Sequence, residues 1–125
     1  MRAKPENRVK KQVKEILDVY KPLVYYRMPV SNGMGLPGLD FYGSACGLHF
    51  EIETKADHKD LTPRQAKTAG EVEASGAKFF AIQFEDDPQI RALEEWLHRV
   101  IMQYHRKQGS LSEQETAYLR GRERG

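Results

Sequence analysis

The chain has 125 residues, a single cysteine (Cys46) and no long apolar run. One thiol excludes an intrachain disulfide framework and a cysteine-based zinc cluster, and it indicates a reducing environment. No segment approaches the about 18 consecutive apolar residues of a membrane-spanning helix, so no membrane association is expected. The first residues lack the pattern of a signal peptide, and we therefore expect a cytoplasmic protein.

The sequence also lacks a glycine-rich phosphate loop ending in lysine and serine or threonine. This absence argues against P-loop nucleotide hydrolysis, and no nucleotide cofactor is expected. The four histidines and Cys46 do not have the spacing of a zinc site. With 39% hydrophobic and 30% charged residues, the chain has the composition of one small globular domain.

The formal net charge of +2 hides an uneven distribution. Residues 1–27 hold eight basic and three acidic side chains, whereas residues 28–85 hold five basic and eight acidic ones. A basic flank beside an acidic centre fits a phosphate-binding surface next to a metal site. On charge alone, the simpler explanation of this uneven distribution is that the charged residues lie on ordinary solvent-exposed helix faces.

Hydrophobic periodicity predicts an α/β fold with a mixed sheet flanked by helices, in the order α-β-β-β-α-β-α. The expected helices span residues 5–19, 63–75 and 88–108, and the expected strands span residues 23–28, 39–43, 48–55 and 78–84. Residues 31–38 contain three glycines and a proline, which is typical of a loop.

We predict a single domain over residues 1–108, with a motif-bearing core at about 5–84 and an extra long helix at about 88–108. Gly109 is expected to end that helix, and Ser112 to begin a short one ahead of a flexible basic tail within residues 109–125. The apolar stripe from Ile90 to Tyr104 is best explained as core. Because this helix lies beyond the motif-bearing core, we also expect it to form the contact of a homodimer.

Residues 48–55 alternate apolar and polar side chains, as in a strand with one buried face. A four-residue loop over 44–47 would place Asp40 opposite Glu51, so that Asp40, Glu51, Glu53 and Lys55 share one face. Opposed carboxylates repel, and a divalent cation would remove that repulsion. The alternative is a surface ladder of ion pairs, which contributes about 0–1 kcal/mol.

Three motifs occur in order along the chain, namely Gly35-x-Pro37-Gly38-Leu39-Asp40, Glu53-Thr54-Lys55 and Thr62-Pro63-Arg64-Gln65. Together they resemble the VRR-NUC branch of the PD-(D/E)xK nucleases, over roughly residues 5–84. In that family the proline and the aspartate are adjacent, whereas here two residues separate them. Asp40 is the only acidic residue between Asp18 and Glu51, so we assign to it the role of the aspartate in the family's motif. The resemblance implies a restriction-endonuclease-like fold.

The resemblance also implies Mg²⁺-dependent hydrolysis of phosphodiester bonds, with Mn²⁺ as a substitute. The implied metal ligands are Asp40, Glu53, the carbonyl of Thr54, and Glu6. Lys55 would contact the attacking water or a phosphate oxygen, and Gln65 would lie near the substrate. A purely structural explanation of the last motif stays open, because Thr62 and Gln65 have the pattern of a helix capping box.

Six residues are expected to contact DNA, namely Arg8, Lys11, Gly35, His58, Lys59 and Arg64. Stand-alone members of the family, commonly from phages or bacteria, cut branched DNA such as four-way (Holliday) junctions as dimers. The resemblance therefore implies a structure-selective DNA endonuclease acting near the nucleoid of a bacterial or phage-infected cell. Two alternatives remain, a non-catalytic nucleic-acid-binding module and an interaction subunit that uses the long helix.

Overall fold

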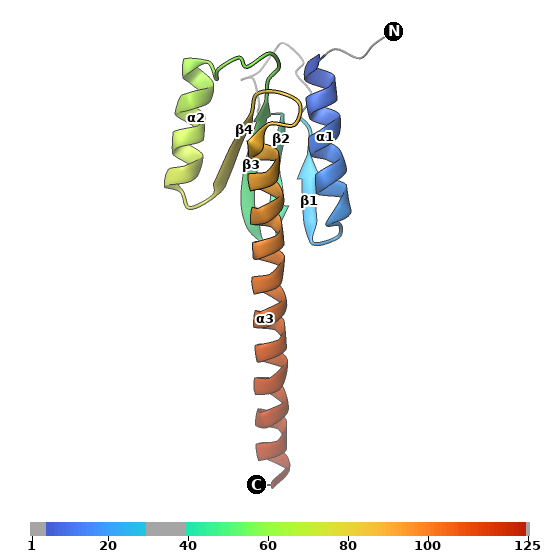
Figure 1. Cartoon of the computed structure of the whole chain (residues 1–125). Coiled ribbons are helices and arrows are strands. Elements are labelled where there is room, and N and C mark those ends of the chain that lie inside the picture. The colour runs from blue at the N-terminus through green and yellow to red at the C-terminus, as the bar shows by residue number, and fades with distance from the viewer. Residues whose placement is uncertain (1–4, 30–39, 125) are drawn as a thin grey trace.

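The computed structural model describes residues 5–29 and 40–124. Its elements are α1 (Pro5–Val19), β1 (Val24–Arg27), β2 (Phe41–Ala45), β3 (Leu48–Thr54), α2 (Pro63–Ala74), β4 (Lys78–Ile82) and α3 (Pro88–Arg124) (Figure 1). The predicted order α-β-β-β-α-β-α and the α/β class are confirmed. The predicted glycine loop at 31–38, with Gly35, lies outside the described residues.

The four strands form one mixed sheet in the order β1-β2-β3-β4. β1, β2 and β3 are antiparallel neighbours, whereas β4 runs parallel to β3. A parallel pair needs a crossover connection, and α2 supplies it. In Figure 1, α1 and α3 lie in front of the sheet and α2 lies beside β4.

The core lies between the sheet and the pair of helices α1 and α3. Val9, Val13 and Leu17 recur every four residues on α1, so they share one face of that helix and are buried. Their partners from the sheet and α3 are Val24, Phe41, Ala45, Phe50, Ile52, Phe80, Ile82, Ile90, Leu93, Leu97 and Val100. Burial of each large apolar side chain contributes about 1.5–3 kcal/mol, which is what holds both helices on this face.

The β2–β3 hairpin differs from the predicted four-residue loop. The structure has a two-residue turn at Cys46 and Gly47, both with positive φ (50° and 86°). Tight turns of this kind match the twist of the two strands, and glycine tolerates the left-handed conformation. The pairing is therefore Tyr42 with Glu51, and the ladder ends at Phe41 with Ile52. One residue further, the same register places Asp40 opposite Glu53. The slip is two residues, so every side chain keeps its predicted face.

The C-terminal helix is also longer than predicted. α3 continues through Gly109 and Ser112 to Arg124 as one helix of 37 residues, without the predicted break. A single glycine inside a helix costs only about 1 kcal/mol, which the flanking helix-forming residues offset. The C-terminal part of α3 projects far beyond the sheet (Figure 1).

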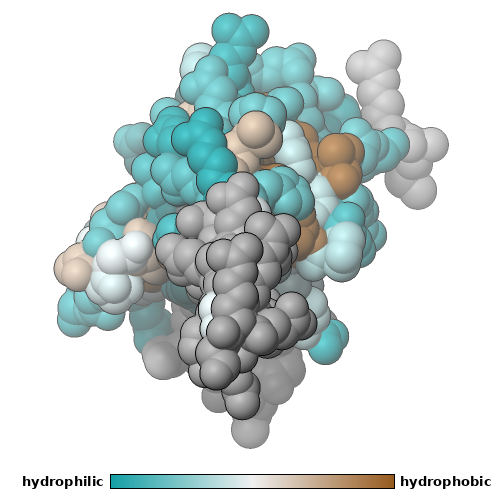
Figure 2. All heavy atoms as spheres, turned by 90° about the horizontal axis from the view of Figure 1, so that it is seen from below, coloured by the Kyte–Doolittle hydropathy of each residue, from teal (hydrophilic) through white to brown (hydrophobic). Residues whose placement is uncertain are grey.

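Seen from the C-terminal end of α3, the described surface is mostly hydrophilic, and its few hydrophobic residues gather on the side of α1 and β1 (Figure 2). Within residues 5–29 and 40–124, no helix is both long enough and apolar enough to cross a membrane.

Candidate active site

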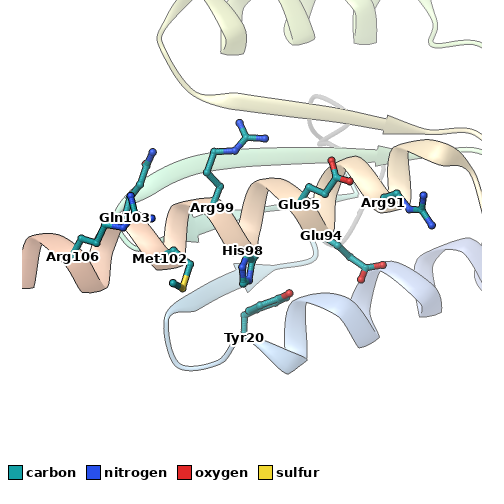
Figure 3. A pocket seen from close by; sticks show the side chains of 9 residues that line it. All are labelled: Tyr20, Arg91, Glu94, Glu95, His98, Arg99, Met102, Gln103 and Arg106. Atoms are coloured by element: carbon teal, nitrogen blue, oxygen red, sulfur yellow. The ribbon is translucent and has the colours of Figure 1, made fainter.

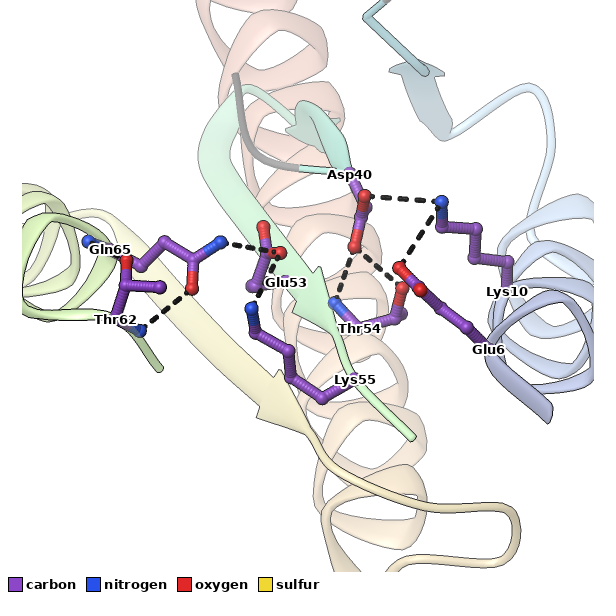
Figure 4. A network of polar contacts seen from close by, with 8 residues as sticks. All are labelled: Glu6, Lys10, Asp40, Glu53, Thr54, Lys55, Thr62 and Gln65. Atoms are coloured by element: carbon purple, nitrogen blue, oxygen red, sulfur yellow. Dashed lines mark hydrogen bonds and ion pairs between the residues drawn. The ribbon is translucent and has the colours of Figure 1, made fainter. Parts of the chain in front are cut away.

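Asp40 is held at the start of β2 by the last residue of β3. Its Oδ2 atom accepts a hydrogen bond from the backbone N–H of Thr54 at 2.7 Å and another from the Thr54 hydroxyl at 2.6 Å. Thr54 is fully buried. Two short bonds from one rigid strand fix the orientation of the carboxylate and leave its Oδ1 atom to face α1 (Figure 4).

Glu53 is the most unusual acidic group of the described chain. It is only 5% exposed, and its Oε2 atom is buried without a hydrogen-bond partner among the described residues. Burial raises the pKa of the Glu53 carboxyl to about 7, and the neighbouring charge of Asp40 adds to this, whereas Lys55 acts in the opposite direction. A buried carboxylate oxygen without a donor is costly and calls for an explanation.

Gln65 connects the start of α2 to Glu53. Its side-chain oxygen accepts from the backbone N–H of Thr62 at 2.9 Å, while its own backbone N–H donates to the Thr62 hydroxyl at 3.2 Å. The Nε2 atom of the same side chain donates to Oε1 of Glu53 at 2.9 Å. The capping box and the contact with the site therefore coexist, because the cap uses only the oxygen of the amide (Figure 4).

Lys55 follows β3 and points back to the same carboxylate. Its Nζ atom lies 3.9 Å from Oε1 of Glu53, and its side chain is 18% exposed. The backbone N–H of Lys55 donates to the carbonyl of Ile82 at 2.7 Å, which extends the pairing of β3 with β4. The lysine is therefore anchored by the sheet and presents its ammonium group beside Glu53.

Lys10 is a member of the site that sequence reasoning missed. Its Nζ atom lies 3.4 Å from Oδ1 of Asp40 and 3.6 Å from Oε1 of Glu6. Glu6 therefore lies at the edge of the site, with Lys10 between it and Asp40 (Figure 4), and its role as a metal ligand stays a prediction. The sequence signal was the i, i+4 spacing of Glu6 and Lys10, which places both on one face of α1.

The described residues that were predicted to bind DNA either pair with other side chains or are exposed. Arg8 pairs with Glu85 at 3.2 Å, and His58 packs on Phe84 with ring centres 4.1 Å apart. Lys11, Lys59 and Arg64 are exposed. Gly35 lies outside the described residues. The positions of Arg8 and His58 are close to each other, because both line a small hollow of about 130 Å³.

The donor set of this site fits Mg²⁺. Asp40 and Glu53 are opposed carboxylates, and the Oε2 atom of Glu53, which has no partner among the described residues, could bind a cation. Mg²⁺ in proteins commonly binds one or two carboxylates together with waters and substrate phosphates. Within the described part of the chain, no group of three or more His, Cys, Asp and Glu side chains is placed to hold a metal. A metal here would therefore depend on these two carboxylates, with the Thr54 carbonyl as the further ligand that the resemblance implies.

A larger hollow, of about 800 Å³, lies between α3 and the end of α1 (Figure 3). It is lined by Tyr20 and by Arg91, Glu94, Glu95, His98, Arg99, Met102, Gln103 and Arg106 of α3. None of these residues belongs to the three motifs, and none has a buried polar atom without a partner. The chemistry of the described chain therefore concentrates at Asp40 and Glu53 and not in this hollow.

No protein-family model matches the chain, and no curated protein matches it by sequence. A solved structure, described as a VRR_NUC domain, matches with a TM-score of 0.55 and 19% sequence identity. The match covers 82% of this chain and 99% of that one. At this level of identity the similarity concerns the fold, and it agrees with the element order and with the sheet topology found above. The chain therefore has the nuclease-like fold of a VRR-NUC domain, as its three motifs predicted.

Proposed function

We propose that this chain is a metal-dependent endonuclease that hydrolyses phosphodiester bonds in DNA, with Mg²⁺ as its metal and Mn²⁺ as a substitute. The observation that carries the proposal is the buried, partnerless Oε2 atom of Glu53, held opposite Asp40. A buried carboxylate oxygen without a partner costs folding free energy, and a cation bound to it would offset that cost. The VRR-NUC fold of the chain supports the same conclusion.

Asp40, Glu53 and the Thr54 carbonyl are the residues that would hold the metal. When bound, the metal supplies a Lewis acid and a water of lowered pKa. Gln65 keeps Glu53 oriented through Oε1 and leaves Oε2 for the metal. Lys55 places its ammonium beside the same carboxylate, where it would stabilise negative charge developing on the phosphate.

We assign the preference for branched DNA, such as four-way junctions, to a homodimer of this chain. The support is the projecting part of α3, which offers a second copy a surface outside the sheet (Figure 1). A two-fold dimer carries two active sites related by the same symmetry as the two strands it would cut at a junction. Sedimentation equilibrium checks the dimer, and a mass near 14.4 kDa at micromolar concentration would contradict it.

The direct test incubates the protein with labelled four-way, flap and linear duplex DNA in the presence of Mg²⁺. Asp40→Asn and Lys55→Met are expected to lower the cleavage rate by about a hundredfold or more. Glu51→Gln is the matched control, since Glu51 is a carboxylate on the same strand that bonds His49 at 3.0 Å and lies outside the pair. Equal cleavage by all variants, or none by the wild type, contradicts the proposal.

One observation favours a second candidate, a nucleic-acid-binding module without catalysis. The Lys10 ammonium already lies 3.4 Å from Asp40 and partly neutralises the site without a metal. Such a module would bind DNA with a steep salt dependence and would not cut it in Mg²⁺ or Mn²⁺. The cleavage assay therefore separates the two candidates.

A further inference from the structure

A second hollow, of about 410 Å³, lies at the edge of the sheet on strand β1. It is lined by Lys21, Pro22, Val24, Tyr25, Tyr26 and Arg27. β1 is an edge strand, paired on one side only, by β2. The lining therefore combines two cations and two tyrosines at an edge of the sheet that no strand of residues 5–29 and 40–124 covers.

The cations and the aromatic rings of this hollow are organised in pairs. The Nε atom of Arg27 donates to the Tyr25 hydroxyl at 2.6 Å, and the guanidinium carbon lies 5.5 Å from the centre of that ring. The Nζ atom of Lys21 lies 5.3 Å from the centre of the Tyr26 ring. Tyr25 is 56% exposed although it is a large aromatic residue. An exposed ring beside fixed cations is the chemistry of sites that stack single-stranded bases and hold their phosphates.

The register of the sheet connects Tyr25 and Arg27, which lie on the outer face of β1 in this hollow, to the candidate active site. Arg27 pairs with Tyr42, and Tyr42 pairs with Glu51, so the three lie in one row across the sheet. The row of Asp40 and Glu53 follows two residues further along, on the same face. Strand spacing and rise per residue then place Arg27 roughly 12 Å from Glu53. Tyr42 is 41% exposed between them, so the path along this face offers a further aromatic ring.

We propose that the β1 hollow binds an unpaired strand of the DNA substrate, with a base stacked on Tyr25 and phosphates at Arg27 and Lys21. The inference rests on the proposed function and adds that the substrate has a single-stranded portion about 12 Å from the cleavage site. Charge favours this occupant over a second copy of the chain. In a two-fold contact the same patch meets itself, which would bring Lys21 and Arg27 against their own counterparts.

One acidic group adjoins the hollow and does not reverse its charge. Asp18 lies 3.0 Å from Lys21 and accepts a hydrogen bond from the Tyr26 hydroxyl at 2.6 Å. It therefore positions two lining residues. Arg27 keeps its contact with Tyr25 alone among the described residues, so its guanidinium has further donors for a phosphate.

The experiment measures binding of the full-length chain to a fluorescein-labelled oligo-dT of about ten nucleotides, by anisotropy in EDTA so that no cleavage occurs. Tyr25→Ala is expected to weaken binding about fivefold or more, because stacking on one base is lost. Tyr25→Phe keeps the ring and is expected to bind within about twofold of the wild type. Arg27→Ala is expected to lower the slope of log affinity against log salt by about 0.7, as for one lost phosphate contact.

Met102→Ala is the control, since Met102 is a 43% exposed apolar residue of α3 outside the β1 hollow. Unchanged binding in both Tyr25→Ala and Arg27→Ala overturns the inference, and so does a wild type that does not bind oligo-dT. A change of sedimentation mass in Tyr25→Ala without a change in affinity also overturns it, because the hollow would then belong to a second copy. Mg²⁺-dependent cleavage of duplex DNA by the wild type would leave the proposed function standing in each case.

Discussion

Glu53 provides a test of the site that needs no substrate. Its carboxyl is 5% exposed, faces Asp40, and has one oxygen without a partner among the described residues. Glu53→Gln removes the charge, while its side-chain oxygen can still accept the hydrogen bond that Gln65 donates. If the metal-free fold is strained by a buried charge, this substitution stabilises the protein although it removes a metal ligand.

The magnitude follows from the pKa of Glu53, which burial raises from 4.5 to about 7. One unit of pKa corresponds to about 1.4 kcal/mol, so ionised Glu53 costs the metal-free fold about 3 kcal/mol at high pH. The folded-state pKa lies above the unfolded one. The stabilising contribution is therefore complete below about pH 4.5 and is lost as the pH rises through about 7. Glutamine does not ionise, so Glu53→Gln does not share this loss.

The assay is urea unfolding in EDTA at pH 5 and pH 8. At pH 8 the free energy of unfolding of Glu53→Gln is expected to exceed that of the wild type by about 2–3 kcal/mol, and at pH 5 the difference is expected to shrink to below about 1 kcal/mol. Glu51→Gln controls for the loss of one carboxylate from the same strand. Added Mg²⁺ is expected to stabilise the wild type and not Glu53→Gln, by mass action.

A wild type that is as stable as Glu53→Gln at pH 8 in EDTA would refute the reasoning, because burial would then not penalise the charge. A difference that is the same at both pH values would also refute it, since the effect would then come from packing and not from ionisation.

Three further predictions concern other parts of the fold. Gly43→Ala would place its β-carbon 1.9 Å from a backbone oxygen of β1, so thermal unfolding should show that the free energy of unfolding falls by about 3 kcal/mol or more. Gly70→Ala is the matched control in α2, where open space surrounds the position, and the free energy of unfolding should rise by about 0.5–1 kcal/mol. Tyr26→Phe removes the hydroxyl that is the main cause of the lowered pKa of Asp18, and an NMR titration should show that pKa rising toward 3.8. The lowered pKa of Asp18 stabilises the fold above the ordinary value of 3.8, and this contribution is lost as the pH falls through the lowered pKa. The Tyr26→Phe variant has less of this contribution, so it should also lose less stability on acidification. Lys10→Gln removes a competing cation 3.4 Å from Asp40, so calorimetry should show Mn²⁺ binding tightened about three- to tenfold, and weaker binding would contradict this role.

Local patterns predicted most of the fold. The helical spacing of Val9, Val13 and Leu17 and the alternation within residues 48–55 identify their elements, because burial on one face imposes those periods. The start of α2 was equally readable, since Thr62 and Gln65 lie three residues apart and cap the helix with each other. These features depend on neighbours along the chain.

The sequence-based predictions were wrong or incomplete for the β2–β3 turn, the end of α3 and Lys10, where the local signal is weak. The turn at Cys46 and Gly47 competes with a four-residue loop of similar composition, and strand pairing decides between them. Gly109 resembles a helix end, but its penalty is small and α3 continues past it. Lys10 is one of several lysines on α1, and its i, i+4 spacing from Glu6 is only a local signal. That it reaches Asp40 depends on how the helix packs against the sheet.

The sequence by itself determined that Asp40, Glu53 and Lys55 share a face of the sheet, because a side-chain period of two survives a two-residue slip of register. Only the tertiary structure decided that Asp40 lies opposite Glu53 and not Glu51, that Lys10 reaches Asp40, and that Oε2 of Glu53 is buried without a donor. These properties depend on a turn, a helix and a crossover that are distant from one another in sequence. The metal-binding chemistry that we propose arises where they meet.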